Sequence, residues 1–327
     1  MHLGVLTRAP WLAWGRPVLA RLWGMLMVLG LVSVLVFVLT RLAAGDPVAL
    51  LLGDQASLQD IAQARARYGL DAPIVEQYLR WLGEVLQGHL GQSIFLQMPV
   101  HQVLLDRVEP TLSLALLAVG VAMLIGVPSG LAAAVWRGRW IDQWVSTLAM
   151  LGASMPSFWM GLLLIQLLAV GLGWFPVSGY GAPDASWAQR LHHLLLPALV
   201  LGMLNSALIT RFTRAAMLDI LGEDYIRTAR AKGLPEVRVI LLHALRNALV
   251  PILTVLGLTL ALMIGGAVVT ETVFNLPGLG NLVVRAVLRR DYPVIQGALL
   301  AIAGVYVLIN GVIDLLYLWV DPRVRHG

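Results

Sequence analysis

Six stretches of this sequence are apolar over a length that suits a lipid bilayer, and they constrain the fold more than any other feature. A helix needs about 20 apolar residues to cross the hydrocarbon core of a membrane. Each stretch has that length or comes close to it, and the six run over residues 22–39, 111–135, 145–172, 194–210, 249–270 and 294–319. The sequence therefore predicts an all-α, polytopic membrane protein with six transmembrane helices.

The composition supports the same class. Hydrophobic residues make up 59% of the chain and charged residues 13%, whereas an average globular domain is roughly half apolar and a quarter charged. The chain contains no cysteine, which excludes disulfides and cysteine-based zinc, haem or iron–sulfur sites. The net charge of +5 comes from basic residues dispersed between apolar runs. These lack the interleaved aromatic motifs of nucleic-acid-binding proteins, so no nucleic-acid partner is expected.

The first apolar run, residues 22–39, follows Arg8, Arg16 and Arg21. A cleaved signal peptide is the alternative interpretation, but the apolar region of such a peptide has about 7 to 15 residues. The longer run favours a retained first span.

Residues 42–107 are polar and helical in pattern without reaching spanning length. Ser57 is a suitable cap for a helix that stops at Gly69, and Asp71 is suitable for another that stops at Gly88. Short polar side chains cap the starts of helices and glycine favours their ends. We expect a folded extramembrane loop.

The distribution of arginine and lysine tests the orientation. If both termini are cytoplasmic, 14 of the 23 basic residues fall in inside segments, in keeping with the positive-inside rule. Five of the other nine belong to the long loop after the first span, where the rule has little force. Arg285, Arg289 and Arg290 lie in a short loop that this arrangement puts outside. Charge alone therefore leaves the side of that hairpin open.

A basic, amphipathic block between the fourth and fifth spans predicts two helices joined by an elbow. Residues 218–232 are good helix formers, Gly233 suits the left-handed end of a helix, and Pro235 suits the first turn of another. In the second helix, Arg238, Arg246 and Asn247 are expected to project away from the packed face. That face is predicted from three- and four-residue spacings to consist of Val237, Ile240, Leu241, Ala244 and Ala248.

The elbow carries a resemblance to a known family. Arg227-Thr228-Ala229-Arg230-Ala231-Lys232-Gly233, followed by His243-Ala244-Leu245-Arg246-Asn247-Ala248, resembles the cytoplasmic "EAA" loop of bacterial ABC importer permeases. In the wider family the loop has Glu-Ala-Ala before the glycine and a proline after it. This chain has Arg227-Thr228-Ala229 in place of Glu-Ala-Ala and Arg246 in place of the proline, a form that resembles the dipeptide, oligopeptide and nickel group. The alternative is a solvated basic loop with no partner.

Segments elsewhere in the chain extend the resemblance to the B-type permease of the peptide group. His89 departs from it, since that family often has aspartate at the position. The similar segments are Gly45-Asp46-Pro47, Gly88-His89-Leu90-Gly91-Gln92-Ser93, Pro110-Thr111-Leu112, Phe274-Asn275-Leu276-Pro277-Gly278-Leu279-Gly280 and Asp291-Tyr292-Pro293.

The resemblance implies that residues 1–327 form a single ABC importer transmembrane domain, with residues 42–107 as an external helical loop and residues 218–248 as the cytoplasmic coupling loop. The protein would lie in the bacterial cytoplasmic membrane with both termini inside. The residues implied in coupling to the ATPases are Asp224, Tyr225, Arg227, Thr228, Ala229, Arg230, Lys232, Gly233, His243, Arg246 and Asn247.

The implied function is that of a transmembrane permease subunit of an ATP-driven importer, which forms half of a translocation pathway for peptides or a related small solute such as nickel. Its implied partners are a second, C-type permease, two ATP-binding subunits that hold ATP and Mg, and an external solute-binding protein. The alternative is a secondary, ion-coupled transporter. That class usually has buried coupling charges and an internal repeat with broken helices, and neither is visible in this sequence.

Motifs for chemistry in this chain itself are lacking. A P-loop needs Gly-Lys followed by Ser or Thr, and the only lysine, Lys232, precedes a glycine. We therefore expect ATP to be bound elsewhere and no cofactor or enzyme activity in this chain. His192 and His193 are adjacent, so on a helix they face different directions, and no further ligand is spaced to complete a metal site.

Polar side chains within the predicted spans suggest a pathway. Gln166, Asn205, Ser206 and Thr210 could line a polar route, or could equally form hydrogen bonds between helices. Asp314 lies about two turns from Asp321-Pro322 at the cytoplasmic end, where a structural role near the interface is favoured over proton transport.

Overall fold

The computed structural model of the protein describes residues 10–42, 57, 59, 63, 71–182 and 184–320, with side chains between residues 21 and 313. The predicted helix between Ser57 and Gly69 and the segment Gly45-Asp46-Pro47 fall largely outside the described residues. The same is true of the side chain of Asp314.

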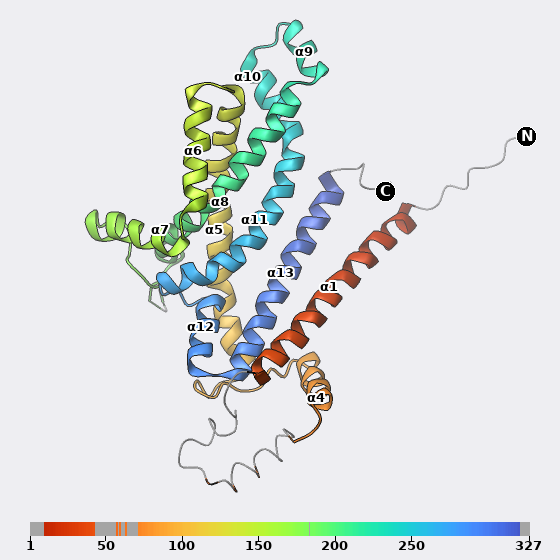
Figure 1. The fold of residues 1–327 in the computed structure, drawn as a ribbon, viewed down its shortest axis with the longest axis vertical. Coiled ribbons are helices and arrows are strands. Elements are labelled where there is room, and N and C mark those ends of the chain that lie inside the picture. Colours follow the sequence, from red (N-terminus) through yellow and green to blue (C-terminus); the bar gives the residue numbers. More distant parts are fainter. Residues whose placement is uncertain are drawn as a thin grey trace, which may run out of the picture. The chain divides into compact units, whose positions relative to one another are not determined.

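Long helices account for most of the described chain, as the sequence predicts (Figure 1). Five of them are long and apolar enough to cross a membrane, and a bent pair of helices would make a sixth crossing. Each predicted span falls within one of these elements. The long helices are α1 (Pro10–Leu42), α5 (Val100–Val135), α8 (Trp187–Leu221), α11 (Leu245–Val273) and α13 (Tyr292–Val320).

The predicted span over residues 145–172 is not a single straight helix. It is divided into α6 (Trp140–Ser154), α7 (Ser157–Leu164) and a π-helical stretch, η1 (Ile165–Gly171), and the two halves meet at 104°. The break falls at Pro156. Proline disfavours the helical conformation in the residue before it, and Met155 accordingly has an extended ψ of 132°.

Glycines bring α5 and α8 into close contact. Gly126 and Gly130 are four residues apart, and small residues at this spacing predict close packing between membrane helices. A β-carbon added at Gly126 would lie 2.7 Å from the Ile209 Cβ, and one at Gly130 would lie 2.5 Å from the Thr210 carbonyl oxygen. Neither distance is possible for real atoms, so the two backbones approach as closely as they do only because glycine stands here. This contact belongs to the core of the larger structural unit, which also contains α11.

The chain divides into two compact units, residues 1–108 with 282–307 and residues 109–281 with 308–327. In the first unit, α4 (Ile74–Leu86) packs on α1 through Phe37, Tyr78 and Trp81, whose ring centroids lie 5.4–6.1 Å apart. The residue that caps α4 is Pro73 and not Asp71, a correction to the prediction. Gly88, with φ of +84°, follows the end of α4 as predicted.

The first unit also brings together two of the segments that resemble the peptide group. The buried carboxylate of Asp291 accepts hydrogen bonds from the Ser93 hydroxyl at 2.5 Å and from the Ile94 N–H at 3.3 Å. The loop before α5 is thereby tied to the turn before α13. Because α5 begins at Val100, the last residues of the predicted loop, 100–107, already belong to this long helix.

Candidate coupling site

The elbow between α8 and α11 contains one more break than predicted. Residues 218–232 are not one helix, because α8 ends at Leu221 and α9 (Asp224–Ala231) begins after Gly222 and an extended Glu223. Glycine is a poor helix former, and its position allows the chain to turn there. The second helix comprises α10 (Glu236–Arg238), a π-helical stretch η2 (Val239–Ala244) and then α11. The elbow caps the end of the α8–α11 pair (Figure 1).

Gly233 forms the joint that the sequence predicts. Its φ is +78°, the region in which residues other than glycine are strained. The Gly233 N–H donates to the Arg230 carbonyl at 2.9 Å, and the Leu234 N–H donates to the Ala229 carbonyl at 3.4 Å. These two bonds are the pair that defines a Schellman motif. A β-carbon at Gly233 would meet nothing within 4 Å, so only the backbone conformation demands glycine here.

Small apolar side chains fasten the elbow to the ends of the spans. Ile226 from α9 and Val239 from η2 are fully buried, and Ala229 is 8% exposed. They form one cluster with Met217 of α8 and Ala248 of α11, among others. Ala229, predicted as a coupling residue, therefore packs inward.

The prediction of which side chains form the packed face of the second helix is partly wrong. Val237 and Leu241 are 67% and 49% exposed, whereas Val239 and Ala244 are fully buried. The reason is the π-helical stretch, in which hydrogen bonds join residues five apart and the turn widens. Spacings of three and four residues cannot predict which side chains face inward across such a stretch. Ala244 and Ala248 are buried as predicted.

An ion pair braces the elbow. Arg230, before Gly233, donates to the two carboxylate oxygens of Glu236, after it, at 3.0 and 2.6 Å. The hydrogen bond with Glu236 raises the pKa of Arg230 above its ordinary value. The sequence analysis did not identify Glu236 as this partner. Both residues are exposed, so the pair contributes about 0–1 kcal/mol and serves mainly to hold the angle.

A second polar contact joins α9 to α11. The Asn247 amide donates to the Tyr225 hydroxyl at 3.0 Å and to the His243 carbonyl at 2.8 Å. On α9 itself, Arg227 pairs with Asp224 at 3.1 Å. These contacts bring the two predicted halves of the coupling sequence together in space.

The outer face of the elbow is both basic and apolar. Tyr225, Leu242, Val237 and Leu241 are large apolar or aromatic residues that are 42–67% exposed. Most of the predicted coupling residues lie on the exposed surface, and His243 is half-buried. The exposed ones are Asp224, Tyr225, Arg227, Thr228, Arg230, Lys232, Gly233, Arg246 and Asn247.

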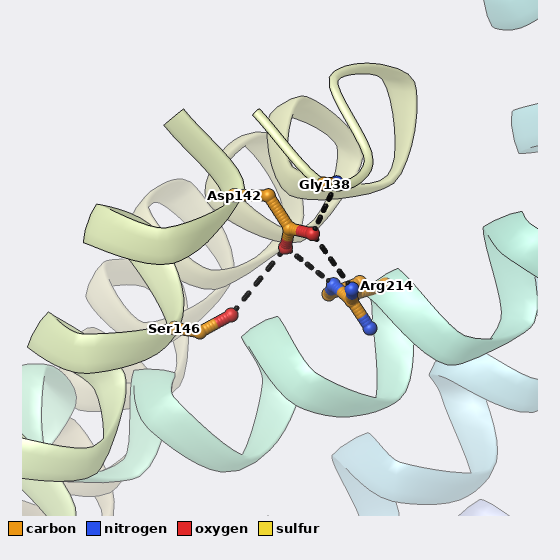
Figure 2. A network of polar contacts seen from close by, with 4 residues as sticks. All are labelled: Gly138, Asp142, Ser146 and Arg214. Atoms are coloured by element: carbon orange, nitrogen blue, oxygen red, sulfur yellow. Dashed lines mark hydrogen bonds and ion pairs between the residues drawn. The ribbon is translucent and has the colours of Figure 1, made fainter. Parts of the chain in front are cut away.

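An ion pair between α6 and α8, close to the elbow, was not predicted from the sequence. Asp142 at the start of α6 is 6% exposed, and its carboxylate accepts from the Nε and Nη2 atoms of Arg214 at 2.6 and 2.8 Å (Figure 2). The Gly138 N–H also donates to it, at 2.9 Å. No local signal identified this pair, because Asp142 lies in the short polar connection between two predicted spans and its partner is 72 positions away. The ion pair fixes the start of α6 to α8.

The predicted pathway residues lie on two elements. Asn205, Ser206 and Thr210 belong to α8, and Gln166 lies on η1 with its side chain exposed. Asn205 and Ser206 donate to carbonyl groups of their own helix, those of Leu201 and Met203, at 2.7 Å each. Ser206 and Thr210 are buried. Their assignment to a pathway stays a prediction.

The two adjacent histidines have different surroundings. The His192 Nε2 atom lies 2.9 Å from the Trp174 carbonyl oxygen, and its ring packs near Phe175. The His193 Nδ1 atom is buried without a hydrogen-bond partner in the described part of the chain. Within those same residues, no group of three or more histidine, cysteine or acidic side chains could hold a metal ion.

Most of this chain matches known membrane components of transport systems. Residues 126–326 match the family described as "Binding-protein-dependent transport system inner membrane component", and residues 15–115 match the N-terminal membrane component of such systems. A probable peptide ABC transporter permease protein, y4tP, of Sinorhizobium fredii is 44% identical over 309 residues, which cover 94% of this chain and 99% of that protein. The glutathione transport system permease protein GsiC of Salmonella paratyphi A is 45% identical over 309 residues, 94% of this chain and 98% of that protein.

A solved structure shares the fold. A chain of the MetNI methionine ABC transporter in an inward-facing conformation superposes with a TM-score of 0.58 at 20% identity, over 67% of this chain and 97% of that one. The matches to these two permeases cover 94% of this chain, so the similarity includes both the spans and the elbow. The chain therefore belongs to the family of binding-protein-dependent transport system inner membrane components, as a transmembrane permease of the peptide group of ABC importers.

Proposed function

We propose that this chain forms half of a translocation pathway for peptides or a related small solute, and that separate ATPase subunits dock on the elbow between α8 and α11. A second permease would supply the other half of the pathway, and an external solute-binding protein would deliver the solute. The names of the relatives support this class of solute, since they include peptide and glutathione permeases.

The observation that carries the proposal is the outer face of the elbow. Val237 and Leu241 expose apolar side chains on the elbow, and the basic residues Arg227 and Lys232 of the same elbow are also exposed. Exposed apolar side chains together with polar ones are typical of an interaction surface. The buried cluster behind it and the Gly233 joint make the elbow one rigid piece. A rigid elbow that is fixed to both α8 and α11 can pass a movement of the ATPases to the spans.

The elbow would then lie on the cytoplasmic side, together with both termini. The positive-inside distribution supports this orientation, with 14 of 23 basic residues in the segments assigned to the inside. The chain itself would carry out no catalytic step and would hold no cofactor. ATP and Mg would be bound by the ATPase subunits, because the single lysine of this chain is not part of a P-loop.

Copurification tests the docking surface. The full chain, expressed with the ATPase genes beside it, should retain the ATPases in detergent. Val237→Ser with Leu241→Ser should lower their retention at least about tenfold, since an interface loses roughly 1 kcal/mol or more with each well-packed apolar contact. Leu288→Ser, which removes an even more exposed leucine from α12 (Leu279–Arg289), is the control and should leave retention unchanged.

Transport in proteoliposomes tests the rest of the proposal. Uptake of a dipeptide or of glutathione should need ATP, the ATPases and the binding protein. Uptake by the isolated chain under an ion gradient would instead indicate a secondary transporter and overturn the proposal. Equal ATPase retention by the double serine variant and the wild type would move the docking site away from the elbow.

A further inference from the structure

A half-enclosed groove of about 400 Å³ lies where the end of α1 meets the beginning of α13. Its walls are apolar, and all of its lining residues belong to the first structural unit. The apolar lining comes from three helices and consists of Val36, Leu39, Val287, Ile295 and Leu299. A volume of several hundred Å³ is the ordinary size of a ligand pocket.

Polar groups also line the groove. Arg290 contributes a guanidinium to its lining, on a residue whose φ of +57° places it in the left-handed region. Tyr292 also lines the groove and is 7% exposed. The Tyr292 hydroxyl is buried and has no hydrogen-bond partner among the described residues. Buried hydroxyl groups are nearly always paired, so one without a partner indicates a missing partner.

Thr40 is not that partner. Its hydroxyl donates to backbone carbonyls of α1, those of Val36 and Phe37, and accepts from the Gln296 amide at 2.7 Å. This last bond joins α1 to α13 directly beside the groove. The groove therefore lies between two helices that are joined by a hydrogen bond.

The residues around the groove indicate which kind of molecule could occupy it. Both α1 and α13 are apolar enough to span a membrane, and Leu39 on the rim is 59% exposed, so a lipid molecule could enter the groove from its open side. An acyl chain fits apolar walls in that position. A phosphate group fits a guanidinium and a hydroxyl donor, because arginine binds phosphate oxygens through charge-assisted hydrogen bonds.

We propose that this groove binds one phospholipid molecule, with an acyl chain against the apolar walls and the phosphodiester at Arg290 and the Tyr292 hydroxyl. The lipid would fill the space between α1 and α13 and satisfy the unpaired hydroxyl. The proposal does not depend on which solute the protein carries or on where the ATPases dock.

Native mass spectrometry of the full chain, together with any subunits that copurify, tests the proposal. A titration with phosphatidylglycerol should give one tightly bound lipid for each copy of this chain. Arg290→Asn removes the charge and keeps a residue that tolerates the left-handed conformation, and it should weaken binding at least about tenfold. Tyr292→Phe removes only the hydroxyl and should weaken binding about 2- to 10-fold.

Two further variants separate the groove from the general surface. Leu39→Trp should block the groove from its exposed rim and abolish tight binding without disturbing the buried packing. Arg289→Gln removes a neighbouring charge that lies over the Phe95 ring and is not part of the groove, and it should bind lipid as the wild type does.

The ligand series identifies the chemistry. Diacylglycerol with the same acyl chains should bind at least about tenfold more weakly than phosphatidylglycerol, and inorganic phosphate should not displace the lipid. Displacement by phosphate alone would overturn the proposal, because it would indicate an anion site. Equal lipid binding by the wild type, Arg290→Asn and Leu39→Trp would also overturn it. So would a cross-link from Leu39→Cys to another subunit, since a protein helix would then occupy the groove.

Discussion

Arg214 on α8 holds the carboxylate of Asp142 on α6 through two hydrogen bonds, at 2.6 and 2.8 Å. The contact is bidentate, a geometry that lysine cannot reproduce. Because Asp142 is buried, the loss of either partner leaves a charge or a polar group without compensation. The ion pair therefore makes the start of α6 and the end of α8 move as one body beside the elbow.

We expect Asp142→Asn and Arg214→Gln each to destabilise the purified protein by about 1–3 kcal/mol, because each variant leaves one partner of the hydrogen-bonded pair unsatisfied while Arg214 keeps part of its contact with solvent. The double variant should lose much less than the sum of the two. Thermal unfolding in detergent measures both effects. Arg211→Gln, an exposed arginine on the same helix, is the control. Additive losses would show that the two residues do not stabilise each other.

The joint at Gly233 should tolerate asparagine but not valine. Asparagine adopts the left-handed conformation more readily than other residues with side chains, whereas a branched side chain there costs at least about 1–2 kcal/mol. Gly233→Val should keep normal levels in the membrane and lose ATP-driven transport, while Gly233→Asn retains most of it. Transport assays with quantitative immunoblots measure this. Full transport by Gly233→Val would show that a rigid elbow is not needed.

The π-helical register of the elbow can be tested with two neighbouring valines. Val239→Ser places a hydroxyl in the buried cluster and leaves a small cavity, and it should lower stability by about 1–3 kcal/mol. Val237→Ser changes an exposed side chain and should change stability by less than about 0.5 kcal/mol. Thermal unfolding compares them. A larger loss of stability in Val237→Ser than in Val239→Ser would instead support the regular α-helical register that the sequence spacing predicts.

The close contact of α5 and α8 should depend on Gly130. Gly130→Ala would put a β-carbon 2.5 Å from the Thr210 carbonyl oxygen, so the helices must move apart, at a cost of about 1–3 kcal/mol for overpacking. Gly120 lies on the same helix, where a β-carbon meets nothing within 4 Å. Gly120→Ala is therefore the control and should be neutral or slightly stabilising. Unfolding temperatures in detergent distinguish the two.

The orientation of the loop that carries the three arginines can be read from single cysteines, since the native chain contains none. Asn281 is only 4% exposed and would react poorly from either side, whereas Leu288 is 79% exposed and Leu242 is 55% exposed. Leu288→Cys should react with an impermeant thiol reagent added to intact cells, and Leu242→Cys only after permeabilisation. The opposite pattern would invert the proposed topology.

Local patterns in the sequence were sufficient for several features of this protein. The apolar runs predicted the spans because a bilayer requires about 20 apolar residues for each crossing. Gly233 and Gly88 were predicted as helix ends because the left-handed conformation is a property of the residue itself. The spacing of Gly126 and Gly130 likewise predicted a close helix contact, although not the partner helix.

Other features could not be predicted because they depend on neighbours that are distant in the sequence. The partnership of Asp142 with Arg214 joins residues 72 positions apart, and that of Ser93 with Asp291 joins residues 198 apart. The brace between Arg230 and Glu236 forms only once Gly233 has turned the chain. Prolines 128, 156 and 197 all permit a kink, yet the chain breaks at Pro156 while prolines 128 and 197 lie inside continuous helices. A proline by itself therefore does not predict where a helix breaks.

The sequence by itself thus determined that this chain lies in a membrane, which segments cross it and where the elbow turns, because hydrophobicity and backbone preference act over a few residues. Only the tertiary structure decided which side chains of the elbow are exposed, which charges are paired and where a groove opens between α1 and α13. Those properties arise from packing between helices, and a π-helical stretch of six residues at Val239–Ala244 was enough to change which side chains face inward.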